Sequence, residues 1–171
     1  IPAAGAGSRF AREGWKKSKP FIDINGQPMI HHVHENLKIK DAVTTIILRE
    51  QDRDINDRCI ADLQRGGVRV EYISTLTEGT ACSVLSTHRL INNDDPLLIA
   101  NSDQLIDFDI NYFVNDCENR GLYGSILVFK DPNRYPKWSF ARVEIHSGLV
   151  EEVAEKQPIS DLATVGIYYF A

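Results

Sequence analysis

Apolar segments with the residue types of β-strands alternate with segments of helical period along most of the chain. The strand-like runs are rich in Ile, Val and Leu, which is typical of strands buried on both faces of a sheet. In the segments between them, apolar residues recur every three or four positions, as on one face of a helix. The strand-like runs are residues 43–48, 68–73, 96–100 and 124–129, and the helix-like segments are residues 28–37, 54–67, 79–91 and 110–121. This alternation predicts an α/β fold, a Rossmann-like three-layer α/β/α arrangement with a mostly parallel mixed sheet.

The last third of the chain has a different pattern. Residues 140–145 and 149–155 resemble two strands separated by the turn sequence His-Ser-Gly, and residues 163–170 resemble a third. We therefore expect a hairpin and a further strand that extend the same sheet. Residues 1–171 are expected to form a single domain. We expect this domain to be truncated at both ends, because the chain lacks an initiator Met and starts at what resembles the end of a strand.

The distribution of charge indicates the kind of ligand. Nineteen Lys and Arg residues against 24 Asp and Glu residues give a net charge of −5, which argues against a nucleic-acid binder with a broad basic face. The first 20 residues differ, because five cationic side chains accompany a single acid, Glu13. A cationic, glycine-containing segment in an otherwise acidic chain indicates an anion pocket.

Two further counts bear on location. No apolar run approaches the roughly 20 residues needed to cross a bilayer, so no membrane partner is expected. The three cysteines cannot all pair within one chain, and they are too far apart for a clustered zinc motif. A reducing cytoplasm fits these thiols best.

The glycine-containing stretch near the start, "AAGAGSRF", differs from two well-known phosphate-binding motifs. Phe10 stands where the dinucleotide fingerprint needs its third glycine, and no Gly-Lys pair is followed by Ser or Thr. What remains is a turn after a strand, in which small residues allow backbone N–H groups to approach phosphate oxygens, with Arg9 and Lys19 as nearby cations. The alternative is an ordinary glycine turn with a solvated basic face.

Several motifs together resemble one family. "PAAGAGSRF" followed by "SKPFIDINGQPMI" resembles the amino-terminal signature of the sugar-phosphate nucleotidylyltransferases. The segments "TEGTACSV", "LLIANSDQ", "DPNRY", "EEVAEKQPIS" and "ATVGIYYF" follow in the family's order. The resemblance covers nearly the whole chain and implies the fold of the nucleotide-diphospho-sugar transferases.

The resemblance also implies a reaction. A phosphate oxygen of a sugar 1-phosphate attacks the α-phosphate of a nucleoside triphosphate, and pyrophosphate leaves with bound Mg²⁺. The expected partners are therefore these two substrates, with Mg²⁺ as cofactor and a homo-oligomer as a further expectation. A role in the synthesis of surface polysaccharide precursors is inferred from the family.

The implied site residues fall into three groups. Those carried over are Ala4, Gly5, Gly7, Ser8, Gly79 and Thr80 for the nucleotide, Arg9, Lys19 and Asp103 for catalysis with Asp103 as metal ligand, and Glu155, Lys156 and Gly166 for the sugar phosphate. From the residues alone, Asp103 is also explained as the cap of a turn. Glu155 and Lys156 are likewise explained as a solvated pair at the end of a hairpin strand.

The sequence departs from the family pattern in places. Ser102 precedes Asp103 where glycine is usual, and "PKWS" replaces a glycine expected after "DPNRY", which makes Trp138 a candidate stacking platform for the substrate. "EKP" is present as "EKQP", and a second metal-binding aspartate is expected beyond residue 171. The identity of the sugar therefore stays open.

Other functions stay open as well. "DFD" at residues 107–109 resembles the Asp-x-Asp metal motif of glycosyltransferases that use a nucleotide-sugar, although Asp109 is also explained as the N-cap of the next helix. A second alternative is a nucleotide-binding module without turnover. His31 and His34 share one helical face but lack a third ligand at suitable spacing for a metal.

Overall fold

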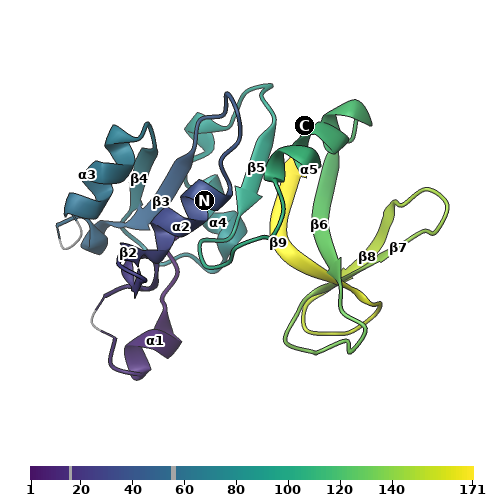
Figure 1. The fold of residues 1–171 in the computed structure, drawn as a ribbon, viewed down its shortest axis with the longest axis horizontal. Helices are drawn as coiled ribbons and strands as arrows, with labels where there is room; N and C mark the ends of the chain where they lie inside the picture. Colours follow the sequence, from purple (N-terminus) through teal and green to yellow (C-terminus); the bar gives the residue numbers. More distant parts are fainter. Residues whose placement is uncertain (16, 55–56) are drawn as a thin grey trace.

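The computed structural model describes residues 1–15, 17–54 and 57–171, without the side chains of Arg9, Ala11 and Asp57. The strands form one larger sheet and two pairs (Figure 1). The helices are α1 (Ser8–Arg12), α2 (Met29–Asn36), α3 (Asp57–Arg65), α4 (Thr80–Leu85) and α5 (Ile110–Asn119), with 3₁₀ turns η1 (Lys19–Phe21), η2 (Glu50–Asp52) and η3 (His88–Leu90). The strands are β1 (Asp23–Ile24), β2 (Gln27–Pro28), β3 (Thr45–Arg49), β4 (Arg69–Ile73), β5 (Leu97–Ala100), β6 (Gly124–Lys130), β7 (Phe140–Val143), β8 (Val150–Ala154) and β9 (Leu162–Phe170).

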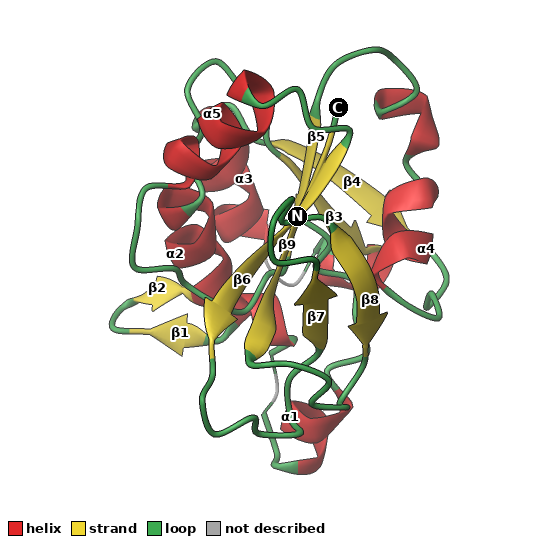
Figure 2. Cartoon of the chain, turned by 90° about the vertical axis from the view of Figure 1, so that its right-hand side faces the viewer, coloured by secondary structure: helices red, strands yellow, loops and turns green. Residues whose placement is uncertain are grey.

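Helices cover the strands on two sides, which gives the predicted three-layer arrangement (Figure 2). Figure 2 shows α2, α3 and α5 on one side of the strands and α4 on the other. Strand β3 explains this arrangement, because its side chains alternate between the two faces. Ile46 and Leu48 pack with residues of α2 and α3, whereas Ile47 packs with Val84 of α4. A strand that is apolar on both faces therefore holds a helix layer on each side.

The pairing of the strands differs in part from the prediction. Strands β3 and β4 are parallel, and Pro2 forms a parallel bridge with Ile47. In the larger sheet, β5, β6 and β7 all pair with β9 antiparallel. The neighbouring strands of this sheet are therefore not mostly parallel, contrary to the prediction. Because β5 and β6 both run against β9, they point the same way, as expected for two strands joined through α5. The last strand of the chain has come to lie between them, which the alternation pattern alone does not reveal.

The predicted hairpin is confirmed, since β7 and β8 pair antiparallel around residues 144–149. The predicted helix over residues 79–91 is shorter than expected. The hydroxyls of Ser86 and Thr87 donate to the carbonyls of Ser83 and Val84, at 2.6 and 2.8 Å, and such bonds compete with helix continuation. Pro28 also differs slightly, because it is the N-cap of α2 instead of its first residue.

The core under β3 generates a stability prediction. Leu48 is fully buried among residues of α2, α3 and β4, so replacing it with Ala leaves a cavity. We expect Leu48→Ala to lower the free energy of unfolding by about 2–5 kcal/mol in urea titrations. The matched control is Leu85→Ala, at a side chain that is 62% exposed, and it is expected to change stability little. Equal effects of the two substitutions would contradict this account of the core.

Candidate active site

Three segments that are far apart in the sequence enclose a cavity of about 830 Å³. They are the loop and turn within residues 2–20, the start of α4 with the residues before it, and the residues that follow β5. The cavity lining contains Ala4, Gly5, Gly7, Ser8, Lys19, Gly79, Thr80 and Asp103. The structure thus brings together all the residues implied for the nucleotide and two of the three implied for catalysis.

The glycine loop begins where the chain leaves the core. Ala3 and Ala4 are buried, and the Ala3 N–H donates to the carbonyl of Ile47 at 2.8 Å, so the loop starts from a fixed position. A Cβ at Gly5 would meet nothing within 4 Å, which leaves open space beside the backbone there. Gly7 has φ +57°, a conformation that favours glycine, and its turn leads into α1. This backbone is therefore accessible to a ligand.

Lys19 reaches the cavity from the turn η1, which is held in place by its buried residues and by a hydrogen bond. Pro20 and Phe21 of η1 are buried, and the Ser18 hydroxyl next to them donates to Asp52 at 2.7 Å. The Lys19 ammonium forms an ion pair with the carboxylate of Asp103, a residue that comes shortly after β5. Its Nζ also lies 5.5 Å from the centre of the Phe10 ring. A cation and a carboxylate from segments 84 residues apart thus meet in one cavity.

The segment expected to border the nucleobase is ordered by hydroxyl groups. The Thr77 and Ser83 hydroxyls are 2.6 Å apart, and Ser83 is buried. The Ser83 N–H donates to the Gly79 carbonyl at 3.1 Å, which fixes Gly79 at the N-cap of α4. Both Thr77 and Ser83 line the cavity, and the sequence analysis missed them. The sequence feature that could have identified them is a pair of hydroxyl residues on either side of Gly79 and Thr80, where α4 begins.

The remaining predicted residues are not in this cavity lining. The Arg9 side chain lies outside the part of the chain that the structure describes. Glu155 and Lys156 form an exposed ion pair after β8, with Nζ and Oε1 2.9 Å apart. Lys156 has φ +54°, which is uncommon for a residue with a side chain. Gly166 lies within β9.

The other metal and stacking candidates have structural explanations. The Asp109 carboxylate accepts the side-chain amide of Asn111 at 2.6 Å and its backbone N–H at 2.9 Å as the N-cap of α5, and these hydrogen bonds lower its pKa. His34 is buried in α2, and burial lowers the pKa of its imidazole. Trp138 is partly buried, with the Phe129 ring edge-on at 5.5 Å and Lys137 Nζ 4.3 Å from its centre. Among the described residues, no group of three or more His, Cys, Asp or Glu could hold a metal.

The three cysteines all lie in helices. Cys59 belongs to α3, Cys82 to α4 and Cys117 to α5, and all three are free thiols. Burial, together with the charge of Asp62, raises the pKa of Cys59 to about 11. Such a thiol is a poor nucleophile at neutral pH. No helix in the described residues is long and apolar enough to span a membrane.

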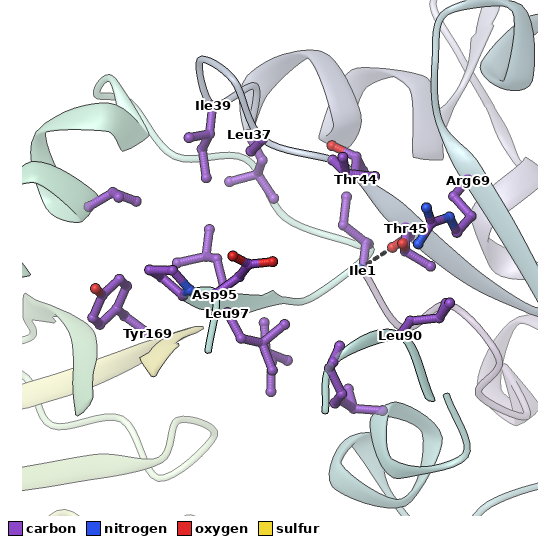
Figure 3. A pocket seen from close by; sticks show the side chains of 18 of the residues that line it. Ile1, Leu37, Ile39, Thr44, Thr45, Arg69, Leu90, Asp95, Leu97 and Tyr169 are labelled. Atoms are coloured by element: carbon purple, nitrogen blue, oxygen red, sulfur yellow. Dashed lines mark hydrogen bonds between the residues drawn. The ribbon is translucent and has the colours of Figure 1, made fainter. Parts of the chain in front are cut away.

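A second cavity, of about 500 Å³, lies between β3 and β5 (Figure 3). Its wall is mixed, because apolar residues such as Ile1, Leu37 and Leu97 and polar residues such as Arg69 and Asp95 both line it. The α-amino group of Ile1 donates to the Thr45 carbonyl at 2.7 Å, and burial lowers its pKa to about 5. The glycine loop beyond Pro2 does not line this cavity. The residues that the resemblance implies for the nucleotide therefore line the cavity around Lys19 and Asp103 and not this one.

Comparisons with known proteins agree with this geometry. A family model described as "Nucleotidyl transferase" matches residues 1–171. Mannose-1-phosphate guanyltransferase beta-B of Xenopus laevis is 27% identical over the whole chain, and the match covers 49% of that protein. The chain thus spans about half the length of this relative.

Two solved structures are similar over 99% of the chain. A nucleoside-diphosphate-sugar pyrophosphorylase from Vibrio cholerae RC9 is 25% identical, with a TM-score of 0.72 over 71% of that chain. A UDP-glucose pyrophosphorylase complexed with UDP-glucose is 18% identical and similar in fold, with a TM-score of 0.77 over 74% of that chain. The match of the family model to the full chain carries the conclusion: the chain belongs to the nucleotidyl transferase family.

Proposed function

We propose that this protein transfers a nucleotidyl group from a nucleoside triphosphate to a sugar 1-phosphate, giving a nucleotide-sugar and pyrophosphate. The observation that carries the proposal is the single cavity formed by the glycine loop, Lys19 and Asp103. Open backbone beside Gly5 suits the oxygens of a triphosphate, and Lys19 suits the charge that develops on them. The similarity to mannose-1-phosphate guanyltransferases and sugar pyrophosphorylases supports the same reaction.

In this proposal the chain mainly positions groups and neutralises charge. An oxygen of the acceptor phosphate forms a bond to the α-phosphorus, and the bond from that phosphorus to the bridging oxygen of pyrophosphate breaks. The backbone around Gly5 and Gly7 holds the triphosphate. Lys19, and Arg9 from the adjacent helix, balance the negative charge on the leaving pyrophosphate.

Asp103 is the residue that fits Mg²⁺. Its side chain is 36% exposed and lies in the same cavity as the glycine loop. Mg²⁺ commonly binds through one or two carboxylates together with substrate phosphates and waters, so one carboxylate next to a triphosphate is a suitable donor set. When bound, Mg²⁺ would supply additional charge neutralisation at the phosphate oxygens. In the structure Lys19 pairs with this carboxylate. With a ligand bound, the same ammonium would turn toward the phosphate.

The acceptor side of the proposal rests on Glu155 and Lys156. Lys156 holds a backbone conformation with positive φ, and such conformations are retained where the surrounding structure requires them, often at functional sites. Its ammonium would bind the phosphate of the sugar 1-phosphate, and Glu155 would bind sugar hydroxyls. The three free thiols and the nucleotide substrates fit a cytoplasmic enzyme that makes precursors for polysaccharides.

Turnover is the direct test. In the full-length protein we expect pyrophosphate release that requires a nucleoside triphosphate, a sugar 1-phosphate and Mg²⁺ together, with GTP and mannose 1-phosphate as the first pair and UTP and glucose 1-phosphate as the second. Asp103→Asn should lower kcat by about 100-fold. Asp107→Asn, in the Asp-Phe-Asp sequence, should leave turnover unchanged. Loss of activity in Asp107→Asn alone, or sugar transfer from a nucleotide-sugar without pyrophosphate release, would favour the glycosyltransferase alternative.

Binding provides a second test, centred on Lys19. Because a charged group bound to phosphate contributes about 1.5–3 kcal/mol, Lys19→Met should weaken binding of the triphosphate by roughly 10- to 100-fold in calorimetric titrations. Its ion pair with Asp103 is about one third exposed, so the loss of folding stability should stay below about 1 kcal/mol. The control is Lys38→Met, which removes a surface lysine paired with Glu35. A large loss of stability with unchanged affinity would instead make Lys19 a structural residue.

A further inference from the structure

Asp52 is a buried acid close to the point where β3 ends. It is only 3% exposed, although Asp is among the residue types that are least often buried. It belongs to the turn η2, which follows directly on β3. Burial of a carboxylate costs free energy unless hydrogen bonds or charges compensate it. The position of this acid therefore needs an explanation, and neither the motifs nor the resemblance assigned it a role.

A hydrogen bond connects Asp52 with a segment 34 residues earlier in the chain. The Ser18 hydroxyl donates to Oδ1 of Asp52 at 2.7 Å, and Ser18 is the residue directly before the turn η1. A hydrogen bond to a carboxylate is about twice as strong as one between neutral groups. The Phe21 N–H in turn donates to the Ser18 carbonyl at 2.9 Å. The start of η1 is thus held through both the side chain and the backbone of Ser18.

Lys19 follows Ser18 directly, and its backbone passes close to the glycine loop. A Cβ at Gly7 would lie 3.8 Å from the Cβ of Lys19 and 3.9 Å from its backbone nitrogen, which are ordinary contact distances. The Lys19 carbonyl accepts the N–H of Ile22 at 3.2 Å, so the backbone on the other side of Lys19 is held as well. A displacement of Ser18 would therefore change the distance between the Lys19 side chain and the glycine loop.

Strand β3 fixes the glycine loop as well as this turn. The Ala3 N–H donates to the Ile47 carbonyl at 2.8 Å, and the Ile47 N–H donates to the Ile1 carbonyl at 3.0 Å. The segment that starts the glycine loop is thus bound to β3 itself, and the turn that carries Lys19 is bound to Asp52 just after β3. Two separate hydrogen-bonded connections therefore place both parts of the candidate triphosphate site relative to one strand.

We propose that Asp52 is a positioning residue, which acts through the Ser18 hydroxyl to hold Lys19 at the distance from the glycine loop that the triphosphate requires. This inference rests on the proposed nucleotidyl transfer. Asp52 and Ser18 do not line the cavity, so their effect on the substrate passes through Lys19. Placement matters because a misplacement of about 1 Å can lower a rate by as much as about 100-fold.

Ser18→Ala in the full-length protein tests the connection. It removes the hydroxyl and leaves Asp52 in place, which is preferable because Asp52 makes a further interaction. Since the buried residues of η1 still hold the turn, we expect kcat/KM for the triphosphate to fall by roughly 3- to 30-fold, with an unchanged KM for the sugar 1-phosphate. Ser18→Thr keeps a hydroxyl and should restore the wild-type values.

The matched control removes a buried hydroxyl away from the candidate site. The Thr87 hydroxyl donates to the Val84 carbonyl at 2.8 Å, and Thr87 does not line the cavity around Lys19. Thr87→Ala should lower the Tm, as Ser18→Ala should, because each loses one hydrogen bond. It should leave kcat/KM for the triphosphate unchanged, which separates a loss of stability from a loss of positioning.

A double-mutant cycle with Lys19→Met tests whether the effect passes through Lys19. In the Lys19→Met background, Ser18→Ala should cause no further loss of kcat/KM, because the group that it positions is absent, although the Tm should still fall. An active wild type with unchanged kcat/KM in Ser18→Ala would overturn this inference alone. Equal losses in both backgrounds, or an equal loss in Ser18→Thr, would do the same. A wild type that releases no pyrophosphate with any substrate pair would overturn the proposed function, and the inference with it.

Discussion

The hydrogen bonding of β9 is the constraint on which the larger sheet depends. β9 pairs with β5, β6 and β7, and β8 joins through β7, so the sheet has no continuous ladder without it. Its middle also carries the bulge at Gly166, next to the end of β5. A bulge interrupts pairing and redirects the backbone. The strand that holds the sheet together thus also contacts Asn101, which lines the cavity. Ile167 and Tyr169 on the same strand belong to the core with α2 and α5.

An ion pair links two walls of the cavity, the turn that carries Lys19 and the segment after β5 that carries Asp103. The ion pair between Lys19 and Asp103 is partly solvated and contributes little to folding stability. Its importance is positional, because it keeps a cation and a carboxylate close together beside the glycine loop. Both charged groups line the cavity, so a charged ligand that replaced this pair would need little reorganisation of the chain.

The sequence predicted the features that depend on local patterns. The alternating strands and helices, the hairpin of β7 and β8 and the N-cap at Asp109 all follow from short-range rules, and the structure confirms them. The position of β9 between β5 and β6 was not predictable in this way, because it depends on pairing between segments about 40 and 70 residues apart. The contact of Asn101 with Gly166 has the same origin. In the site, Thr77, Ser83 and Asn101 lie within the quoted motifs, but the contacts that they make with one another or with Gly166 are not encoded by those motifs.

The loop between β6 and β7 is held in place at both of its ends. Asp131 is buried, and its carboxylate accepts the N–H groups of Asn133 and Tyr135, at 3.2 and 2.9 Å. At the far end of the loop, the Ser139 carbonyl accepts the N–H of Thr164, two residues before Gly166. Trp138 in this loop packs edge-on against Phe129 of β6, so the loop is held by both β6 and β9. The glycine loop is attached to β3 instead, so the glycine loop and the loop between β6 and β7 are held by different strands.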